Sequence, residues 1–475
     1  MKKLITLSLS SLLLGMSSLN AQTKTVLNTN FEKSEKQDVL KGEYFAVING
    51  YSFEHIENGS INKLVKKQNG KNVESIKLPG KTDLYKRYDA WSTFKQFGKY
   101  LVEVLDWENN KTDKQDYILT FYDENLIEKK VIPVAKLTSD WEKRDFHTEV
   151  INEYLFIKTV EQKGGGNNSI GIKVIGNDLE LKKLDQYTVA GKVSIQKVKI
   201  ENDILSFIQM VKNTNGQILE LKYIGYNLKD NQKTSVNLDF SALKEGVSDF
   251  DYRLDDNTLK IHGYTLDDYE SFQFGKVFSI AIDINTENVL HTNTSEKISG
   301  DAKEMYTAFD LLKQGKVNEG RYFSYRQLNT WKLEDGSTIT LGEHYNYYET
   351  VDKSSYDYYK PHHLHADLII SKFNEAGEVE WMKTVPRNTR STQLKDTEIF
   401  SHLNNEEVSL VYESNGDFML TKLDLSSENI ETELIFNKKE HKSKTNFGVY
   451  TQLSEDEFAL SIYDLKNHNV LMVAF

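Results

Sequence analysis

The chain has 475 residues with 26 tyrosines and 23 phenylalanines, no cysteine, and a formal net charge of −12 at pH 7. The aromatic residues can supply a large core, and the lack of cysteine excludes disulfides and thiolate metal ligands. The acidic balance argues against a nucleic-acid partner, because such a surface needs clustered Lys and Arg to displace the counterions of phosphate.

Residues 1–21 have the pattern of a secretory signal peptide. Lys2 and Lys3 precede an apolar run at residues 4–14, and Ala21 is a small residue at the expected cleavage site. No later segment approaches the roughly 18 apolar residues of a membrane-spanning helix. We therefore expect an exported mature chain, residues 22–475, that is periplasmic or extracellular and has no transmembrane segment.

A short pattern, in which two strands flank a polar turn, occurs eight times along the chain. It is clearest at residues 401–412 (SHLNNEEVSLVY) and 452–463 (QLSEDEFALSIY). We place its turns at Gly42, Gly98, Asn152, Asn202, Asp256, Asp335, Asn404 and Glu455. Most copies are followed by a second hairpin, such as residues 117–134, so that each repeat provides four antiparallel strands.

Repeats of about 50 residues with four strands each must stack against their neighbours to bury both faces of each small sheet. The pattern therefore predicts an all-β fold, a single eight-bladed β-propeller over residues 22–475, with a seven-bladed ring as the alternative. The last repeat lacks a fourth strand. Residues 24–31 (KTVLNTNF) are the candidate to complete it and close the ring, although they could instead belong to the first blade.

Two neighbouring motifs carry a resemblance to known proteins. Residues 367–386 (DLIISKFNEAGEVEWMKTVP) follow residues 333–343 (LEDGSTITLGE). On these motifs the chain resembles β-propeller repeat proteins, and more specifically an uncharacterised exported family of Bacteroidota. The resemblance implies structural roles, a turn with positive φ for Gly377 and outer-strand packing for Trp381. The Asp box of sialidases has a different residue spacing from the motif at residues 367–386, so the resemblance does not imply sialidase activity.

Two long spacings between repeats indicate insertions. Residues 300–316 contain apolar residues at helical spacing, which predicts a short helix between two blades. Residues 345–365 are rich in tyrosine and predict a long loop between the second and third strands of the sixth blade. Because both kinds of connection open on the same side of a propeller, we expect them to lie together on one face. Long loops on a rigid scaffold commonly carry binding sites.

The tyrosine-rich insertion supplies the candidate ligand-binding residues. Aromatic rings with a hydroxyl group suit the recognition of a glycan or a peptide. The alternative is that some of these rings only fix the loop to its blade. The candidates are Tyr345, Tyr347, Tyr348, Tyr356, Tyr358 and Tyr359.

His363, His365 and Asp367 alternate along the chain, so they would share one face of a strand. Two imidazoles and a carboxylate at this spacing could hold zinc or ferrous iron. The sequence fixes no further ligand, and a junction between turn and strand also collects polar residues. A divalent metal is therefore the only cofactor that the sequence raises.

An aspartate-rich segment in the fifth repeat contains Asp249, Asp251, Asp255 and Asp256. Paired carboxylates could act in acid–base chemistry or bind calcium. Asp255 and Asp256 fall at the predicted hairpin turn, where such side chains bond their own backbone, and we favour that role.

The sequence has no G-x-S-x-G elbow and no cysteine nucleophile, so no catalytic residue is assigned. We expect an exported, non-catalytic binding or scaffold protein that recognises a glycan, a peptide or an envelope protein through one propeller face. The alternative is a secreted glycan-active hydrolase or lyase.

Overall fold

The computed structural model describes residues 25–29, 43–58, 61–68, 71–78, 90–109, 114–163, 166–215, 217–266, 274–298, 317–351, 359–391, 399–404, 406–437, 446–452, 457–463 and 468–474. Within these ranges the chain is almost entirely β-strand, apart from a 3₁₀ turn, η2, at Trp141–Lys143. No helix in these ranges is long and apolar enough to cross a membrane. The helix predicted at residues 300–316 lies outside the described residues.

The first four sheets are antiparallel meanders of four consecutive strands. The first contains β2 (Glu43–Ile48), β3 (Tyr51–Asn58), β4 (Ile61–Gln68) and β5 (Lys71–Lys77), and the second contains β6 (Ala90–Phe97), β7 (Tyr100–Asn109), β8 (Lys114–Tyr122) and β9 (Glu128–Thr138). The third contains β10 (Arg144–Ile151), β11 (Tyr154–Gln162), β12 (Asn167–Ile175) and β13 (Leu181–Ala190), and the fourth contains β14 (Lys192–Glu201), β15 (Ile204–Lys212), β16 (Ile218–Asn227) and β17 (Lys233–Asn237).

The next three sheets continue the same order. The fifth contains β18 (Val247–Asp255), β19 (Thr258–Thr265), β20 (Lys276–Asp283) and β21 (Val289–Lys297). The sixth contains β22 (Val317–Lys332), β23 (Thr338–Val351), β24 (Tyr359–Phe373) and β25 (Val379–Val385), with β26 (Thr389–Ser391) also paired to β24. The seventh contains β27 (Phe400–Leu403), β28 (Glu407–Ser414), β29 (Asp417–Asp424) and β30 (Ile430–Phe436).

The eighth sheet joins the two ends of the described chain. It contains β31 (Asn446–Gln452), β32 (Glu457–Tyr463), β33 (His468–Ala474) and β1 (Thr25–Thr29), in the order β1-β33-β32-β31. Leu27 pairs with Val470 at the centre of this antiparallel contact. The prediction that residues 24–31 complete the last repeat is therefore confirmed.

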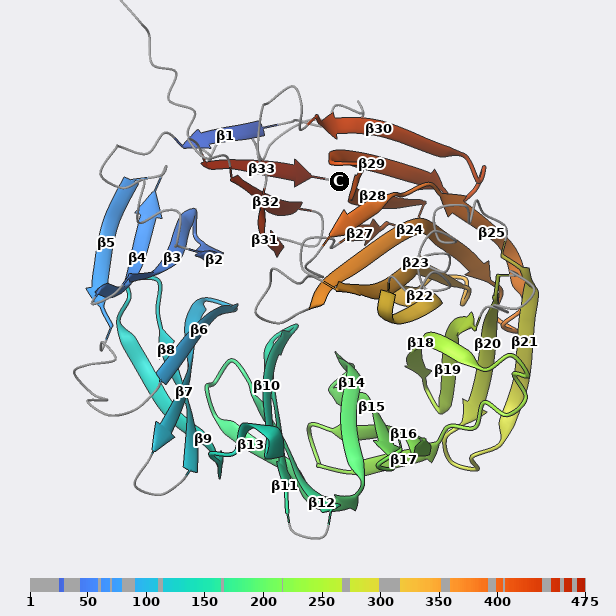
Figure 1. Cartoon of the computed structure of the whole chain (residues 1–475), viewed down its shortest axis with the longest axis horizontal. Coiled ribbons are helices and arrows are strands. Elements are labelled where there is room, and N and C mark those ends of the chain that lie inside the picture. Colours follow the sequence, from blue (N-terminus) through green and yellow to red (C-terminus); the bar gives the residue numbers. More distant parts are fainter. Residues whose placement is uncertain are drawn as a thin grey trace, which may run out of the picture.

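The sheets are arranged in a ring in chain order, and the first strand of each lies toward the middle (Figure 1). The prediction of an all-β propeller of antiparallel sheets is confirmed. Gly377 has a φ of 77° in the turn before β25, as the motif implies. Trp381 lies on β25 and packs against the core between the sixth and seventh sheets.

The turn of the first repeat was predicted in the wrong place. We placed it at Gly42, but β2 begins at Glu43 and its hairpin to β3 turns at Asn49–Gly50. Asn49 has a φ of 52° and Gly50 a φ of 77°, as a two-residue turn of twisted strands requires. The Asn-Gly dipeptide was the stronger signal. The turn predicted at Glu455 lies outside the described residues, and the other six markers fall between the first and second strands of their sheets.

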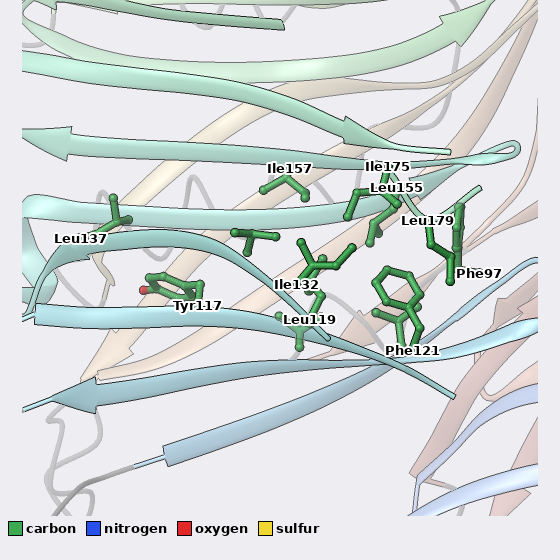
Figure 2. Packing of buried hydrophobic residues seen from close by; sticks show 13 residues of the cluster. Phe97, Tyr117, Leu119, Phe121, Ile132, Leu137, Leu155, Ile157, Ile175 and Leu179 are labelled. Carbon is green, nitrogen blue, oxygen red and sulfur yellow. The ribbon is translucent and has the colours of Figure 1, made fainter. Parts of the chain in front are cut away.

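The core is divided among the interfaces between neighbouring sheets. Figure 2 shows one such interface, where Leu119 and Phe121 of the second sheet face Leu155 and Ile157 of the third, and all four are buried. Each such side chain contributes about 1.5–3 kcal/mol when it leaves water. The first to the seventh sheets share apolar faces with their neighbours in this way, so their arrangement follows from the alternation of apolar residues along the strands.

Candidate functional site

The sixth sheet differs from the others because three of its strands are much longer. β22 has 16 residues, β23 has 14 and β24 has 15. β25 pairs with β24 only from Leu368 to Phe373, and β26 takes its place next to His363–His365. Figure 1 shows the long strands reaching toward the middle of the ring. We call residues 343–351 and 359–367 the hairpin extension.

The prediction of a loop over residues 345–365 is wrong for most of that range. β23 runs through Val351 and β24 begins at Tyr359, so the described part of the insertion is paired strand. Five of the seven residues at 345–351 are aromatic or β-branched, and such residues favour strands. The position between the second and third strands was predicted correctly. Residues 352–358 lie outside the described residues, as does the helix expected beside them.

One face of the hairpin extension carries a row of aromatic and imidazole rings. Tyr345 pairs with His365 and Tyr347 with His363 across the two strands. The hydroxyl of Tyr345 forms a 2.7 Å hydrogen bond with Nδ1 of His363, and the rings of Tyr347 and His363 lie 5.2 Å apart. Tyr345, Tyr347 and His363 are partly exposed. Beyond them, the Tyr347 hydroxyl donates to the carboxylate of Glu349.

The opposite face holds a second aromatic pair. Tyr348 stacks on His362 with ring centroids 4.8 Å apart and an angle of 15° between the rings. Thr350 Oγ1 lies 2.8 Å from His362 Nε2, which fixes that imidazole. Asn346 precedes Tyr348 on β23 and is fully buried, and neither atom of its amide group has a hydrogen-bond partner among the described residues.

A buried ion cluster lies at the base of the hairpin extension. Nη1 of Arg387 lies 2.6 Å from Glu343 Oε2, and Nη1 of Arg326 lies 3.0 Å from Oε1. Nδ1 of His365 lies 3.1 Å from both carboxylate oxygens. Arg387 reaches Glu343 from the connection between β25 and β26, so the change of edge strand positions one of the two guanidinium groups.

The cluster controls the protonation of its members. Burial favours a raised pKa for Glu343, but the hydrogen bond from His365 and the charges of Arg387 and Arg326 outweigh it, and the pKa falls below its usual value. Burial lowers the pKa of His365 more than Glu343 raises it. Burial, with help from nearby His365 and Arg326, also lowers the pKa of His363. At neutral pH Glu343 is therefore charged and both imidazoles are neutral.

Two buried imidazoles lie at the base of the hairpin extension, and each has one ring nitrogen without a hydrogen-bond partner. His365 Nε2 and His344 Nε2 have no hydrogen-bond partner among the described residues. The His344 ring lies 4.3 Å from that of Tyr325 and 4.5 Å from that of Phe274. Burial lowers the pKa of His344 to about 3.

The structure brings together only some of the predicted site residues. Tyr345 and Tyr347 share one face with His363 and His365, whereas Tyr348 lies on the other. Tyr359 begins β24, but its side chain is outside the described part of the structure. Tyr356 and Tyr358 lie outside the described residues.

The predicted metal ligands are engaged with other protein groups. His365 bonds Glu343 and His363 bonds Tyr345 through their Nδ1 atoms, and Asp367 also has a partner. Among the described residues there is no group of three or more His, Asp or Glu side chains that could hold a metal ion. We therefore build no proposal on a metal at His363, His365 and Asp367.

The aspartates of the fifth repeat divide between two roles. Asp256 lies in the turn between β18 and β19 with a φ of 51°, as predicted. Asp255 was predicted in the same turn but is the last residue of β18, and its carboxylate pairs with Arg253 at 2.8 Å. Asp249 and Asp251 instead form ion pairs with Lys197 and Lys199 of β14, at 3.1 and 2.7 Å. These pairs connect the fourth and fifth sheets, so these carboxylates have a structural function.

The sequence reasoning missed Glu343, Arg326 and Arg387. A signal for Glu343 was present, because Ile339 and Leu341 precede it at alternate positions and are buried. A glutamate in the next core-facing position implies a buried charge that needs a partner. Nothing in the local pattern pointed to Arg326 or Arg387.

Two grooves lie elsewhere, between the outer strands of neighbouring sheets. One of about 500 Å³ lies along β13, β15, β16 and β17, and another of about 580 Å³ lies between β21 and β25. In the first, Lys233 is paired with Asp185 at 2.8 Å and Tyr187 with Gln209 at 2.6 Å. We take the hairpin extension as the candidate site, because its long strands carry the tyrosine and histidine side chains that the sequence singled out.

The solved structures that are similar to this chain include the following three, each of which matches most of its length. The WD40 domain of SCAP from fission yeast has 8% identity and a TM-score of 0.39, covering 92% of this chain and 95% of that one. The β-propeller domain of the Trilobed protease from Pyrococcus furiosus has 9% identity and a TM-score of 0.37, covering 82% and 93%. The polysaccharide lyase Uly1 has 10% identity and a TM-score of 0.38, covering 96% and 99%.

Similarity at this level concerns the fold alone, and no residue role is transferred from these proteins. No family model matches the chain, and no curated protein matches it in sequence.

Proposed function

We propose that this protein is an exported propeller that binds a glycan through the tyrosine- and histidine-bearing face of the hairpin extension. We further infer that each of the eight sheets is one blade, and that the chain is released to the periplasm or beyond it. The likeness to exported repeat proteins of Bacteroidota belongs to the same proposal. A peptide or an envelope protein is the alternative ligand.

The row of rings on paired strands is the observation that supports this function. Tyr345, Tyr347 and His363 are partly exposed, and their polar atoms are held by neighbours at short distances. Sugars have apolar C–H faces beside hydroxyl groups, and a phenol ring offers a matching apolar face and a polar edge. Because the rings stand on long paired strands, little conformational entropy is lost when a ligand binds.

Point substitutions test this site better than a deletion, since residues 345–351 are part of the sixth sheet. The mature chain and its Tyr345→Ala and Tyr347→Ala variants are applied to a glycan array, and the hits are titrated. We expect each variant to bind at least about tenfold more weakly. Trp141→Ala, which changes a 75% exposed ring on η2, is the control and should bind as the parent does. Unchanged binding by both tyrosine variants contradicts the site.

A glycan-active lyase or hydrolase is the second candidate. The hydrogen bond between Tyr345 and His363 favours it, because a phenol and a neutral imidazole 2.7 Å apart can pass a proton between them. The test is incubation with a panel of polysaccharides and measurement of new chain ends, with His363→Gln as the inactive variant. A preparation that binds but forms no product supports the non-catalytic function. If the protein is a purely structural component of the envelope, it should neither bind a glycan nor form a product.

A further inference from the structure

The ion cluster at the base of the hairpin extension carries more positive than negative charge. Two guanidinium groups, those of Arg326 and Arg387, bond to the single carboxylate of Glu343. His365 adds no charge at neutral pH, because burial lowers its pKa. One positive charge is therefore in excess within a protein whose formal net charge is −12.

The two arginines differ in their surroundings. The side chain of Arg387 is fully buried, and its Nε donates to the backbone oxygen of Glu413 at 3.2 Å. The side chain of Arg326 is 35% exposed, and its hydrogen bond to Glu343 uses Nη1 alone. Its other nitrogen atoms have no hydrogen-bond partner among the described residues. The excess charge is therefore available to solvent on Arg326.

Glu343 does not need Arg326 for its own neutralisation. Arg387 bonds one of its oxygens at 2.6 Å, and His365 donates to both. A third, partly exposed donor adds little to a carboxylate that is already paired. The guanidinium of Arg326 presents a planar set of N–H donors, whose geometry matches a carboxylate.

Arg326 also lies at one end of the row of rings. Its guanidinium carbon is 5.3 Å from the centre of the Tyr345 ring, and Tyr347 follows two residues further along β23. Glu349 stands beyond Tyr347 at the other end. A ligand on this face therefore meets a cation near Arg326 and an anion near Glu349, which gives it a preferred direction.

We propose that the hairpin extension selects carboxylate-bearing glycans, with a uronate carboxylate on Arg326 and the neighbouring sugar over Tyr345 and Tyr347. This inference rests on the proposed function and names the class of its ligand. It requires the guanidinium N–H groups of Arg326 and the tyrosine rings beside it to bind the same saccharide.

The test is calorimetric titration of the mature chain with oligogalacturonate, with neutral cello-oligosaccharide of the same length, and with a sulfated oligosaccharide. Arg326→Gln should weaken oligogalacturonate binding about 10- to 100-fold, as the loss of one charge-assisted hydrogen-bond pair predicts. Arg326→Lys keeps the positive charge but lacks the planar set of donors. Its affinity for oligogalacturonate should lie between those of the parent and Arg326→Gln. Lys360→Gln removes the same charge from the other face of β24 and should bind as the parent does.

The outcomes separate this inference from the function on which it rests. Unchanged oligogalacturonate affinity in Arg326→Gln overturns the inference, as does a preference for the sulfated probe. Binding of the neutral oligosaccharide alone, lost in Tyr345→Ala, overturns the inference and leaves the proposed function standing. Failure of every glycan to bind overturns both. Thermal unfolding of each variant shows whether the fold is intact, so that a loss of affinity is assigned to the site.

Discussion

Nδ1 of His365 lies 3.1 Å from each carboxylate oxygen of Glu343, so one N–H on the third strand of the sixth sheet is shared by two acceptors on the second. This contact fixes the tautomer of His365 and leaves its Nε2 as a buried acceptor. It also holds β23 against β24 at the β-bulge between Glu343 and Tyr345. The base of the hairpin extension is therefore rigid.

Removal of the carboxylate should destabilise the protein strongly. Glu343→Gln leaves the guanidinium of Arg387, whose side chain is 0% exposed, without its counter-charge. We expect a loss of about 3–5 kcal/mol in the free energy of unfolding, measured with urea. Glu180→Gln removes a carboxylate that is 73% exposed and paired with Lys130, and should change stability by less than about 0.5 kcal/mol. Similar effects of the two substitutions would contradict the role of the cluster.

The free energy of unfolding should decrease in mild acid, because buried histidines stay neutral in the folded chain and become protonated in the unfolded chain. His344 has a pKa of about 3 in the folded chain, against about 6.5 when unfolded. Below pH 6.5 the unfolded chain therefore binds a proton that the folded chain does not, and stability decreases as pH falls toward 3. Each pH unit should cost about 1.4 kcal/mol for this residue.

The measurement is the free energy of unfolding at pH 7.5 and at pH 5. His344→Phe, which has no titrating group, should lose about 2 kcal/mol less than the parent over this interval. His147→Gln changes an imidazole that is 50% exposed and should follow the parent. An equal decrease in the parent and His344→Phe would show that His344 is not buried in its neutral form.

The first hairpin should depend on the backbone freedom of Gly50. Its φ is 77°, and a Cβ added there would meet no atom within 4 Å, so the cost of a side chain is backbone strain alone. Gly50→Ala should destabilise the protein by about 1–2 kcal/mol in urea unfolding. Gly50→Asn should cost less, because asparagine tolerates this conformation. Equal effects of alanine and asparagine would place the turn elsewhere.

The contact between β1 and β33 should allow a disulfide in a chain that has no other cysteine. Asn28 and Asn469 are paired across these strands, at a separation that a disulfide spans. The double variant Asn28→Cys/Asn469→Cys should form an intramolecular bond on oxidation and melt at a higher temperature. Thr25→Cys/His468→Cys, displaced by about 13 Å along the strand, should stay reduced. Failure of the matched pair to form the bond would mean that β1 does not close the eighth sheet.

The repeat and the closing strand could be predicted because both depend on the local alternation of apolar and polar residues along the strands. The prediction of a loop over residues 345–365 was wrong because the high polarity of this segment obscured its strand propensity. The two halves of the segment are cross-strand partners of each other, as Tyr345 is of His365 and Tyr347 of His363, and this pairing is not visible in a single run of residues. The turn at Gly42 was wrong because spacing was given more weight than the Asn49–Gly50 dipeptide.

The candidate site was only partly predictable for a related reason. Tyr345, Tyr347 and His363 stand out by composition, and two of them are cross-strand partners. Arg326 is the cross-strand partner of Glu343 in the hairpin of β22 and β23, whereas Arg387 meets Glu343 only because the chain passes from β25 to β26 beside β24. A pattern search along one chain has no means of finding such a meeting.

The proposed function requires a ligand to bind at the hairpin extension, and hydrogen–deuterium exchange with and without saturating oligogalacturonate tests this directly. We predict slower exchange in peptides that cover β23 and β24, and unchanged exchange in β13 and β16. Slower exchange along the groove at β13 and β16, with β23 and β24 unaffected, would contradict the account.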